Sequence, residues 1–386
     1  MALIKRQLYE TVNEHLDKYP VSALTGPRQS GKTTLLKSMF PGYQYMSLED
    51  PTVRKFATED MAGFLKKYNR KIIFDEAQRV PELFSWLQTE ADSSTEMGRF
   101  ILSGSQNFHL MEKITQSLAG RVALFKLFPY DFREMKNGGL LPDNWRKLII
   151  RGCYPAIYTR DLHAPMYYSN YVNTYVKRDL TTLTNIHDMQ RFNVFLKLCA
   201  GRAGQILNLS NLANETGISH TTARSWLTLL EACYIVFLLP PYFENFNKRV
   251  VKSPKLYFYD TGLLSWLLGY RKEEDVENPV TAGPLFENLI VSECIKENEH
   301  TAQLKEFWYW RDSHGHEVDL LVKQGDMFDI FEIKSTETVL PRLFEGLDYF
   351  DKISGGRVRE KYLVYGGTED QDWTNYKVRG WCGNYH

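Results

Sequence analysis

One short stretch of the chain has the residue types and spacing of a loop that binds phosphate. It runs from Gly26 to Thr33, reads Gly26-Pro27-Arg28-Gln29-Ser30-Gly31-Lys32-Thr33, and fits G-x-x-x-x-G-K-[ST]. The glycines let successive backbone N–H groups turn inward around an anion, because no Cβ blocks a positive φ or a close phosphate. In this pattern Lys32 reaches the β- and γ-phosphates and the Thr33 hydroxyl ligates Mg²⁺.

The residues on either side of this loop support the same interpretation. Val21–Leu24 is a short apolar run, which predicts a buried strand, and Thr34–Met39 predicts a helix. A strand, a glycine-rich loop and a helix in this order place bound phosphates at a helix N-terminus. We therefore expect residues 26–34, Thr34 included, to bind the phosphates of a nucleotide.

A second apolar run ends in two acids. Lys71-Ile72-Ile73-Phe74-Asp75-Glu76 has no polar alternation, which is typical of a strand buried on both faces of a parallel sheet. After a phosphate-binding loop, this is the Walker B strand of a P-loop protein. We expect Asp75 to hold Mg²⁺ through water and Glu76 to act as the general base that polarises the attacking water. The alternative is a solvated acidic turn.

A third apolar run, Arg99–Ser103, ends in small polar residues. It matches the sensor strand of AAA+-type ATPases, in which a polar side chain contacts the γ-phosphate or the attacking water. Ser105 is our candidate, with Gln106 and Asn107 as competitors, and a helix N-cap is the structural alternative. Arg121, before a strand at Val122–Leu127, is a candidate arginine finger in cis or in trans, with a surface salt bridge as its alternative.

These stretches together resemble a family of bacterial and archaeal AAA+-type P-loop ATPases. The C-terminal half of that family has no known function and combines a winged helix with a restriction-endonuclease-like fold. The resemblance rests on Gly26–Thr34, Ile72–Gln78, Ile101–Ser105, Ser117–Arg121, Arg151–Pro155 and Lys255–Leu263, which run along nearly the full chain. It implies an α/β fold with a parallel-sheet core and a helical lid, and ATP with Mg²⁺ as cofactors.

The middle of the chain is mostly helical. Tyrosine and valine recur at helical spacing over 168–176, which favours a core stripe over a base-stacking platform. A helical lid in AAA+ proteins closes over the nucleotide, so Lys177 or Arg178 is a further candidate phosphate contact.

Residues 209–231 have the signature of a helix-turn-helix, with Gly217 at the turn and Ser219 at a cap. Its second helix would present His220, Thr221, Thr222, Arg224 and Ser225 to DNA. A single arginine gives only weak affinity for the phosphate backbone of DNA, because non-specific affinity comes mainly from several Lys or Arg contacts. DNA contact and protein docking therefore both stay open.

The C-terminal part contains a second candidate centre. Asp319 on one predicted strand and Glu332-x-Lys334 on the next, with helical Glu287, resemble the PD-(D/E)XK nuclease set. Alternate strand residues share a face, so Glu332 and Lys334 point together, as do Glu317 and Asp319. The carboxylates of Glu287, Asp319 and Glu332 would bind Mg²⁺ and Lys334 would orient the water. A half-exposed strand without activity is the alternative.

Length and composition set the frame for these sites. The chain has 386 residues, 47 Lys and Arg against 47 Asp and Glu, and 43% hydrophobic residues, so we expect several folded domains. Basic residues outnumber acids in 190–260, and acids outnumber basic residues after 283. Five scattered cysteines and no long apolar run lead us to expect a cytoplasmic protein without a membrane partner.

We expect an ATPase core over 1–135, a helical lid over 136–188, a winged helix over 189–265 and an endonuclease-like domain over 266–386. Two functions compete. In one, an ATPase drives a nucleic-acid-associated module that cuts DNA. In the other, nucleotide state controls the docking of partner proteins. ATP is the expected ligand under both, and DNA and a homo-oligomer are further candidate partners.

Overall fold

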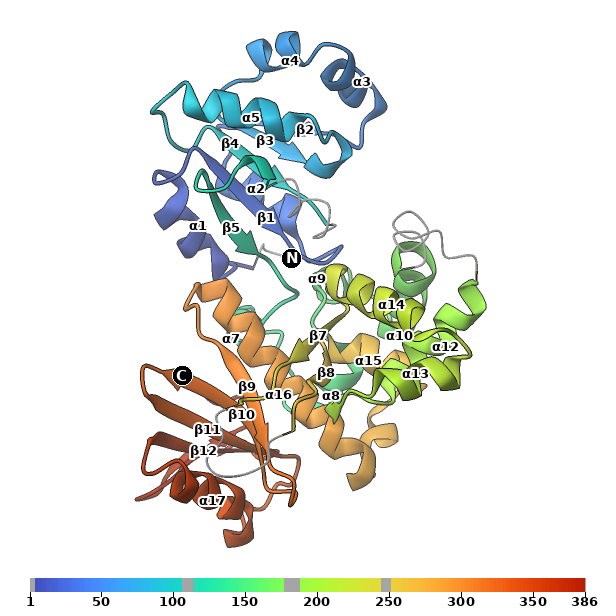
Figure 1. Ribbon diagram of the computed structural model, residues 1–386, viewed down its shortest axis with the longest axis vertical. Helices are drawn as coiled ribbons and strands as arrows, with labels where there is room; N and C mark the ends of the chain where they lie inside the picture. The colour runs from blue at the N-terminus through green and yellow to red at the C-terminus, as the bar shows by residue number, and fades with distance from the viewer. Residues whose placement is uncertain (1–3, 106–113, 115, 177–187, 244–250, 386) are drawn as a thin grey trace.

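The computed structural model describes residues 4–105, 114, 116–176, 188–243 and 251–385 (Figure 1). Figure 1 shows three units: an N-terminal α/β unit, a mainly helical middle unit and a C-terminal sheet unit. The long helix α16 (Pro279–Thr301) extends from the region of the N-terminal unit past the C-terminal sheet.

The N-terminal unit is a five-stranded parallel sheet with helices on both sides. Its strand order is β2-β3-β4-β1-β5, and the residues of β1, β3 and β4 are all buried, as their apolar runs predict. Its elements are α1 (Leu8–Leu16), β1 (Val21–Thr25), α2 (Lys32–Met39), β2 (Gln44–Ser47), α3 (Pro51–Glu59), α4 (Met61–Lys67), β3 (Ile72–Asp75), the 3-10 turn η1 (Ala77–Arg79), α5 (Leu83–Asp92), β4 (Phe100–Ser103) and β5 (Val122–Lys126).

The strand order determines which residues meet. Strand β4 lies between β1 and β3, and all three run in the same direction. The loop after β1, the acids after β3 and the serines after β4 therefore share one edge of the sheet, where ligands of open α/β sheets bind.

The middle unit packs helices around a three-stranded antiparallel sheet of order β6-β8-β7. Its helix pair α13 and α14 is joined by a short turn at Gly217, and the Ser219 side chain caps α14 by accepting from Thr222 N–H. Its elements are α7 (Phe132–Asn137), α8 (Trp145–Arg151), α9 (Pro155–Thr159), α10 (Ala164–Tyr171), the π-helical turn η2 (Val172–Val176), α12 (Met189–Ala200), β6 (Gln205–Ile206), α13 (Leu209–Thr216), α14 (His220–Ala232), β7 (Val236–Leu239), β8 (Lys255–Phe258), α15 (Thr261–Leu268) and η3 (Glu273–Val276).

The C-terminal unit is a mixed six-stranded sheet of order β13-β14-β12-β11-β10-β9. Leu347 and Phe350 of α17 belong to the core on one face of the sheet, while Phe331 and Ile333 join the core that includes α16 on the other. After α16 its elements are β9 (Phe307–Arg311), β10 (Glu317–Gln324), β11 (Met327–Lys334), η4 (Pro341–Phe344), α17 (Glu345–Ile353), β12 (Val358–Tyr365), β13 (Gln371–Asp372) and β14 (Lys377–Gly380).

Two stretches that carry the family resemblance pack against each other in the middle unit. The buried carboxylate of Asp260 accepts hydrogen bonds from Cys153 N–H at 2.8 Å and, as a helix cap, from Leu263 N–H at 2.9 Å. Gly152 has φ +70°, and a Cβ there would lie 1.9 Å from the Tyr168 hydroxyl oxygen. The glycine before Cys153 is thus needed for both its conformation and its space.

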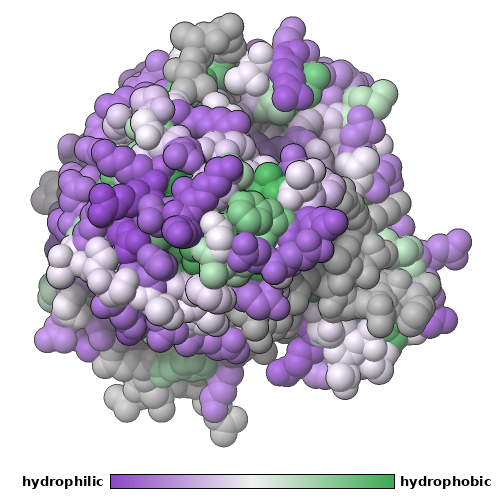
Figure 2. Space-filling view, turned by 90° about the horizontal axis from the view of Figure 1, so that it is seen from above, coloured by the Kyte–Doolittle hydropathy of each residue, from purple (hydrophilic) through white to green (hydrophobic). Residues whose placement is uncertain are grey.

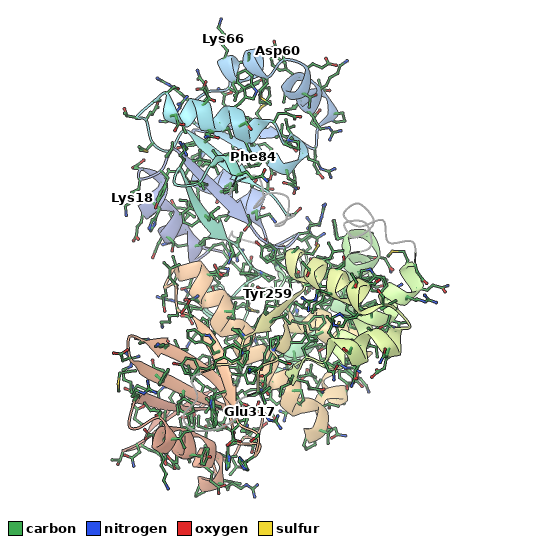
Figure 3. All side chains as sticks on the ribbon, viewed as in Figure 1. Lys18, Asp60, Lys66, Phe84, Tyr259 and Glu317 are labelled. Atoms are coloured by element: carbon green, nitrogen blue, oxygen red, sulfur yellow. The ribbon has the colours of Figure 1, made fainter. Side chains whose placement is uncertain are left out.

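Aromatic side chains join the N-terminal and middle units. The Tyr259 ring, labelled between these units in Figure 3, stacks on Phe128 with centroids 4.5 Å apart, and Tyr234 meets Phe128 edge-on. The Tyr234 hydroxyl is hydrogen-bonded at 2.8 Å to Thr25 Oγ1, directly before the phosphate-binding loop. The middle unit therefore contacts the base of that loop.

The outer end of the N-terminal unit is polar. Figure 2, which views the molecule from this end, is dominated by hydrophilic residues around one small hydrophobic group. Within the described ranges, every helix is either too short or too polar to cross a bilayer.

Candidate functional site

The loop over residues 26–33 has the backbone of an anion cradle. Gly26 has φ +141° and Gly31 φ +99°, and a Cβ on Gly26 would lie 2.1 Å from the Leu127 carbonyl oxygen. The buried Lys32 ammonium lies over the loop and donates to the carbonyls of Gly26 at 2.9 Å and Pro27 at 2.8 Å. Thr34 is exposed on the first turn of α2. A phosphate in the loop would offer Lys32 stronger, charged acceptors than these carbonyls.

Asp75 accepts hydrogen bonds from three side chains at this edge of the sheet. Its Oδ2 accepts from Thr33 Oγ1 at 2.9 Å and from the Tyr45 hydroxyl at 2.5 Å, and its Oδ1 accepts from Ser103 Oγ. Burial and the hydrogen bond to Asp75 raise the pKa of Tyr45 well above its usual range. Hydroxyl and carboxylate oxygens this close fit the hard-oxygen donor set that Mg²⁺ prefers. Tyr45 and Ser103 are additions that sequence reasoning missed.

Glu76 follows Asp75 in a left-handed conformation, with φ +56°. Its Oε2 accepts from Gln78 Nε2 at 2.5 Å and from Ser105 Oγ at 3.2 Å. The structure thus brings the predicted base and the predicted sensor serine together beside Asp75. The competing candidates Gln106 and Asn107 lie outside the described residues.

Arg121 lies at the opposite edge of this sheet. Its carbonyl accepts from Val21 N–H at the start of β1, and its guanidinium pairs with Asp92 at 2.5 and 3.0 Å. At about 3.3 Å per strand residue, the five-residue β1 separates it from the loop by roughly 15 Å. The structure therefore does not bring Arg121 to the phosphate-binding loop of its own chain, and a role as an arginine finger in trans stays a prediction.

The helical segment after α10 touches the phosphate-binding loop through one tyrosine. The Tyr175 hydroxyl accepts from Gln29 Nε2 at 2.7 Å, and the Arg28 guanidinium lies 5.5 Å from the ring centroid. Tyr168 and Tyr171 are buried core residues, as the stripe predicts. Lys177 and Arg178 lie outside the described residues.

The second helix of the predicted helix-turn-helix is partly open to solvent. His220, Thr221, Arg224 and Ser225 are exposed on α14, and Thr222 is half-buried. His220, Arg224 and Glu231 line a groove of about 640 Å³ that also includes Ser253 and Pro254. Arg224 and Glu231 give the groove one positive and one negative charge. This agrees with the weak binding of DNA phosphate that the sequence predicts.

The four residues of the predicted nuclease centre lie close together: Asp319, Glu332 and Lys334 are on strands of the C-terminal sheet, and Glu287 is on α16. Lys334 Nζ is 3.0 Å from Asp319 Oδ2 and 2.5 Å from Glu332 Oε1. Burial and the Asp319 charge raise the pKa of Glu332. Burial would raise the pKa of Asp319, but the ammonium groups of Lys334 and Lys255 lower it. Glu287 reaches the group from α16.

Lys255, Tyr257 and Glu317 complete this centre. Lys255 Nζ lies 2.8 Å from Glu287 Oε1, 2.5 Å from Glu317 Oε1 and 4.0 Å from Asp319 Oδ1. The Tyr257 hydroxyl also donates to Glu287 Oε1. The carboxylates do not fit a divalent ion in this arrangement, because an ammonium already lies among the same oxygens. The sequence gives one indication that Lys255 has a special role: a lysine begins the otherwise apolar run Lys255-Leu-Tyr-Phe.

A buried polar network links the N-terminal unit to α16. Arg6 donates to Ser30 O, Phe128 O and Glu134 Oε2, all at 2.6–2.8 Å. His300 accepts from Phe128 N–H through Nε2, so its Nδ1 carries the proton donated to Asp131.

Asp131, Glu134 and His300 lie close enough to hold a metal ion. Burial would raise the pKa of Asp131, but the hydrogen bond from His300 lowers it to about 2. Glu134 accepts from Arg6 and Gln7, and both ring nitrogens of His300 are engaged. The donors are thus taken up by the network, which supports a structural role.

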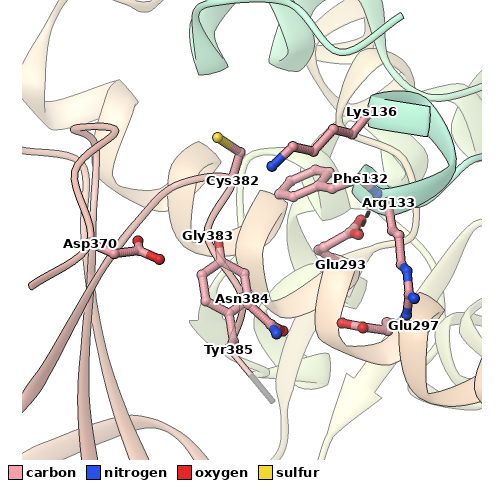
Figure 4. Close-up of a pocket in the computed structure, with 10 residues that line it drawn as sticks. All are labelled: Phe132, Arg133, Lys136, Glu293, Glu297, Asp370, Cys382, Gly383, Asn384 and Tyr385. Carbon is pink, nitrogen blue, oxygen red and sulfur yellow. Dashed lines mark hydrogen bonds between the residues drawn. The ribbon is translucent and has the colours of Figure 1, made fainter. Parts of the chain in front are cut away.

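A separate cavity of about 380 Å³ lies between α7, α16 and the C-terminal loop (Figure 4). Burial raises the pKa of Glu293 to about 8, against the opposing charge of Lys296. None of the predicted site residues lines this cavity. The lining residues are Phe132, Arg133, Lys136, Glu293, Glu297, Asp370, Cys382, Gly383, Asn384 and Tyr385.

Three family models match parts of this chain. Residues 18–136 match the family described as AAA domain, 142–274 a domain of unknown function (DUF8612), and 282–381 another (DUF4143). Among solved structures, the Walker-type ATPase PABY2304 of Pyrococcus abyssi is similar with a TM-score of 0.48, at 15% identity over 69% of this chain and 96% of that one. AMPPCP-bound DnaA from Aquifex aeolicus is similar with a TM-score of 0.28, at 16% identity over 60% and 89%.

The AAA domain match and the sheet edge together define a P-loop ATPase of the AAA type, as the sequence predicts. The chain is 31% identical over 345 residues to the uncharacterized protein Rv2008c of Mycobacterium tuberculosis and equally to Mb2031c of Mycobacterium bovis. The match covers 88% of this chain and 75% of each relative. The chain belongs to the family of these mycobacterial proteins.

Proposed function

We propose that this ATPase is a regulatory switch, in which the nucleotide at the edge of the N-terminal sheet controls the middle and C-terminal units. The observation that carries the proposal is a set of contacts at the phosphate-binding loop and the residue before it, two with the middle unit and one with Arg6, whose network leads to α16. Thr25 pairs with Tyr234, Gln29 with Tyr175, and Ser30 O with Arg6. A change in the conformation of the loop on nucleotide binding would therefore alter all three contacts.

In the proposed site Lys32 and the loop amides bind the triphosphate, and Thr33 and Asp75 hold Mg²⁺. Mg²⁺ held there would supply positive charge that offsets the phosphate charge during transfer. Glu76 orients the attacking water and takes its proton, while Ser105 and Gln78 hold the Glu76 carboxylate. Tyr45 and Ser103 position Asp75.

The network through Arg6 gives the switch a route to the C-terminal sheet. Arg6 joins the loop carbonyl of Ser30 to Glu134, and His300 joins the adjacent Asp131 to the end of α16. The same helix carries Glu287 into the C-terminal centre. A continuous 23-residue helix thus spans both regions and would move as one element.

Replacing Lys32 with Ala is expected to abolish ATP binding, because it removes the ammonium that neutralises the β- and γ-phosphates. Calorimetric titration with ATP and Mg²⁺ measures the loss. Lys55→Ala on α3 of the same unit is a matched control, since Lys55 is exposed and its ion pair is with the exposed Glu59. Equal ATP affinity in Lys32→Ala and wild type would overturn the site.

Partner class is tested by ATP turnover with and without DNA. If the protein is a regulatory switch, ATP turnover is expected to change little when DNA is added, because the exposed α14 offers few cationic contacts for DNA phosphates. Strong stimulation by DNA would favour a nucleic-acid processor instead. Light scattering with and without ATP tests the role of Arg121 in trans, which requires an oligomer.

DNA cleavage by the C-terminal unit stays a separate prediction. The convergence of Asp319, Glu332 and Lys334 favours it, whereas Lys255 among the carboxylates opposes it. Plasmid from the turnover assay is therefore examined for breaks. Mg²⁺-dependent nicking that Asp319→Ala removes would assign cleavage to this centre, and nicking that survives would exclude this centre as its source.

A further inference from the structure

The C-terminal carboxylates receive a cation from another part of the chain. Lys255 opens β8 in the sheet of the middle unit and is 3% exposed. Its Nζ is 2.8 Å from Glu287 and 2.5 Å from Glu317, which come from α16 and β10. A lysine is almost never this deeply buried unless its charge is paired.

We propose that the Lys255 ammonium is the cation of this centre and keeps divalent metal ions out of it. Mg²⁺ needs oxygens at about 2.0–2.1 Å and Ca²⁺ at about 2.3–2.6 Å. An ion bound by Glu287 and Asp319 at such distances would overlap the ammonium that already contacts Glu287. The two cations would also repel each other in a site where solvent screening is weak.

The second lysine does not fill the same position. Lys334 Nζ contacts Asp319 Oδ2 and Glu332 Oε1, whereas Lys255 lies toward Glu287, Glu317 and Asp319 Oδ1. Four carboxylates therefore share two ammonium groups and the Arg311 guanidinium, which lies 3.0 Å from Glu317 Oε2. Removal of Lys255 would leave a set of hard oxygen donors with excess negative charge, which is the environment that divalent ions prefer.

Any metal-dependent chemistry at Asp319 requires Lys255 to withdraw first, and β8 would have to shift relative to the C-terminal sheet. In the structure, the ion pairs of Lys255 with Glu287 and Glu317 instead hold the middle and C-terminal units together.

The test is Mn²⁺ binding by the full chain in the absence of nucleotide, followed by electron paramagnetic resonance and by melting temperature. Wild type is expected to bind no Mn²⁺ that depends on Asp319. Lys255→Met is expected to bind an additional Mn²⁺ and to melt at a higher temperature when Mn²⁺ is added. Adding Asp319→Asn to Lys255→Met is expected to remove both effects.

Lys252→Met is the matched control, because Lys252 is an exposed lysine in the segment just before β8. If Lys255→Met fails to fold, Lys255→Met with Glu317→Gln replaces it, since that pair removes one positive and one negative charge. Mn²⁺ bound by wild type and lost in Asp319→Asn would overturn the proposal. A folded Lys255 variant that binds no additional Mn²⁺ would overturn it as well.

Discussion

Glu76→Gln is expected to bind ATP and Mg²⁺ like wild type while ATP turnover falls by about 10²–10⁴-fold, the range for loss of a general base. Glutamine keeps the size of the side chain but cannot accept the proton of the attacking water. Lys32, Thr33 and Asp75 remain in place, so binding is retained. Steady-state phosphate release measures turnover, and calorimetric titration with ATP measures binding.

Glu82→Gln is the control for this variant. Glu82 is exposed at the start of α5 on the same unit, and its replacement is expected to leave turnover unchanged. Wild-type turnover in Glu76→Gln would show that another group activates the water. Loss of ATP binding would instead show that Glu76 maintains the site, through its contacts with Gln78 and Ser105.

Arg6→Ala is expected to lower the stability of the chain by about 3–5 kcal/mol, the cost of breaking a buried ion pair from one side. The Glu134 carboxylate, which is 0% exposed, would lose its guanidinium, and the carbonyls of Ser30 and Phe128 would lose their donor. Because Ser30 belongs to the phosphate-binding loop, weaker ATP binding is expected together with the lower melting temperature.

The neighbouring Lys5 provides the comparison. Lys5 and Glu10 form an ion pair whose side chains are 69% and 71% exposed, so Lys5→Ala is expected to change the melting temperature little. Equal melting temperatures for the Arg6 and Lys5 variants would contradict the structural role of the network. A destabilised Arg6 variant with unchanged ATP affinity would separate the network from the nucleotide site.

Much of the N-terminal unit follows from local sequence rules. The mainly apolar runs before Gly26 and Asp75 predict strands that the structure contains, because a strand buried on both faces is built mostly from apolar residues. The sequence over 56–68 by itself has the pattern of a single helical stretch. The structure has two helices there, because Asp60 ends α3 and caps α4 by accepting from Gly63 N–H.

Other features depend on partners that sequence rules do not supply. Arg121 fits an arginine finger by its position in the chain, yet the strand direction puts it at the edge away from the loop. Tyr45 and Ser103 join Asp75 only because β2 and β4 flank β3. No spacing rule relates residues on separate strands before the strand order is known.

The sequence by itself determined the phosphate-binding loop, the acid pair after the buried strand, and the grouping of Glu332 with Lys334 on one strand face. Each of these depends on residues within a few positions of one another, where backbone geometry alone fixes the relation. Only the tertiary structure decided that Lys255 lies among the C-terminal acids and that Arg6 and His300 connect the loop to α16. The reason is that these contacts join residues far apart in the chain, and packing of whole units brings them together.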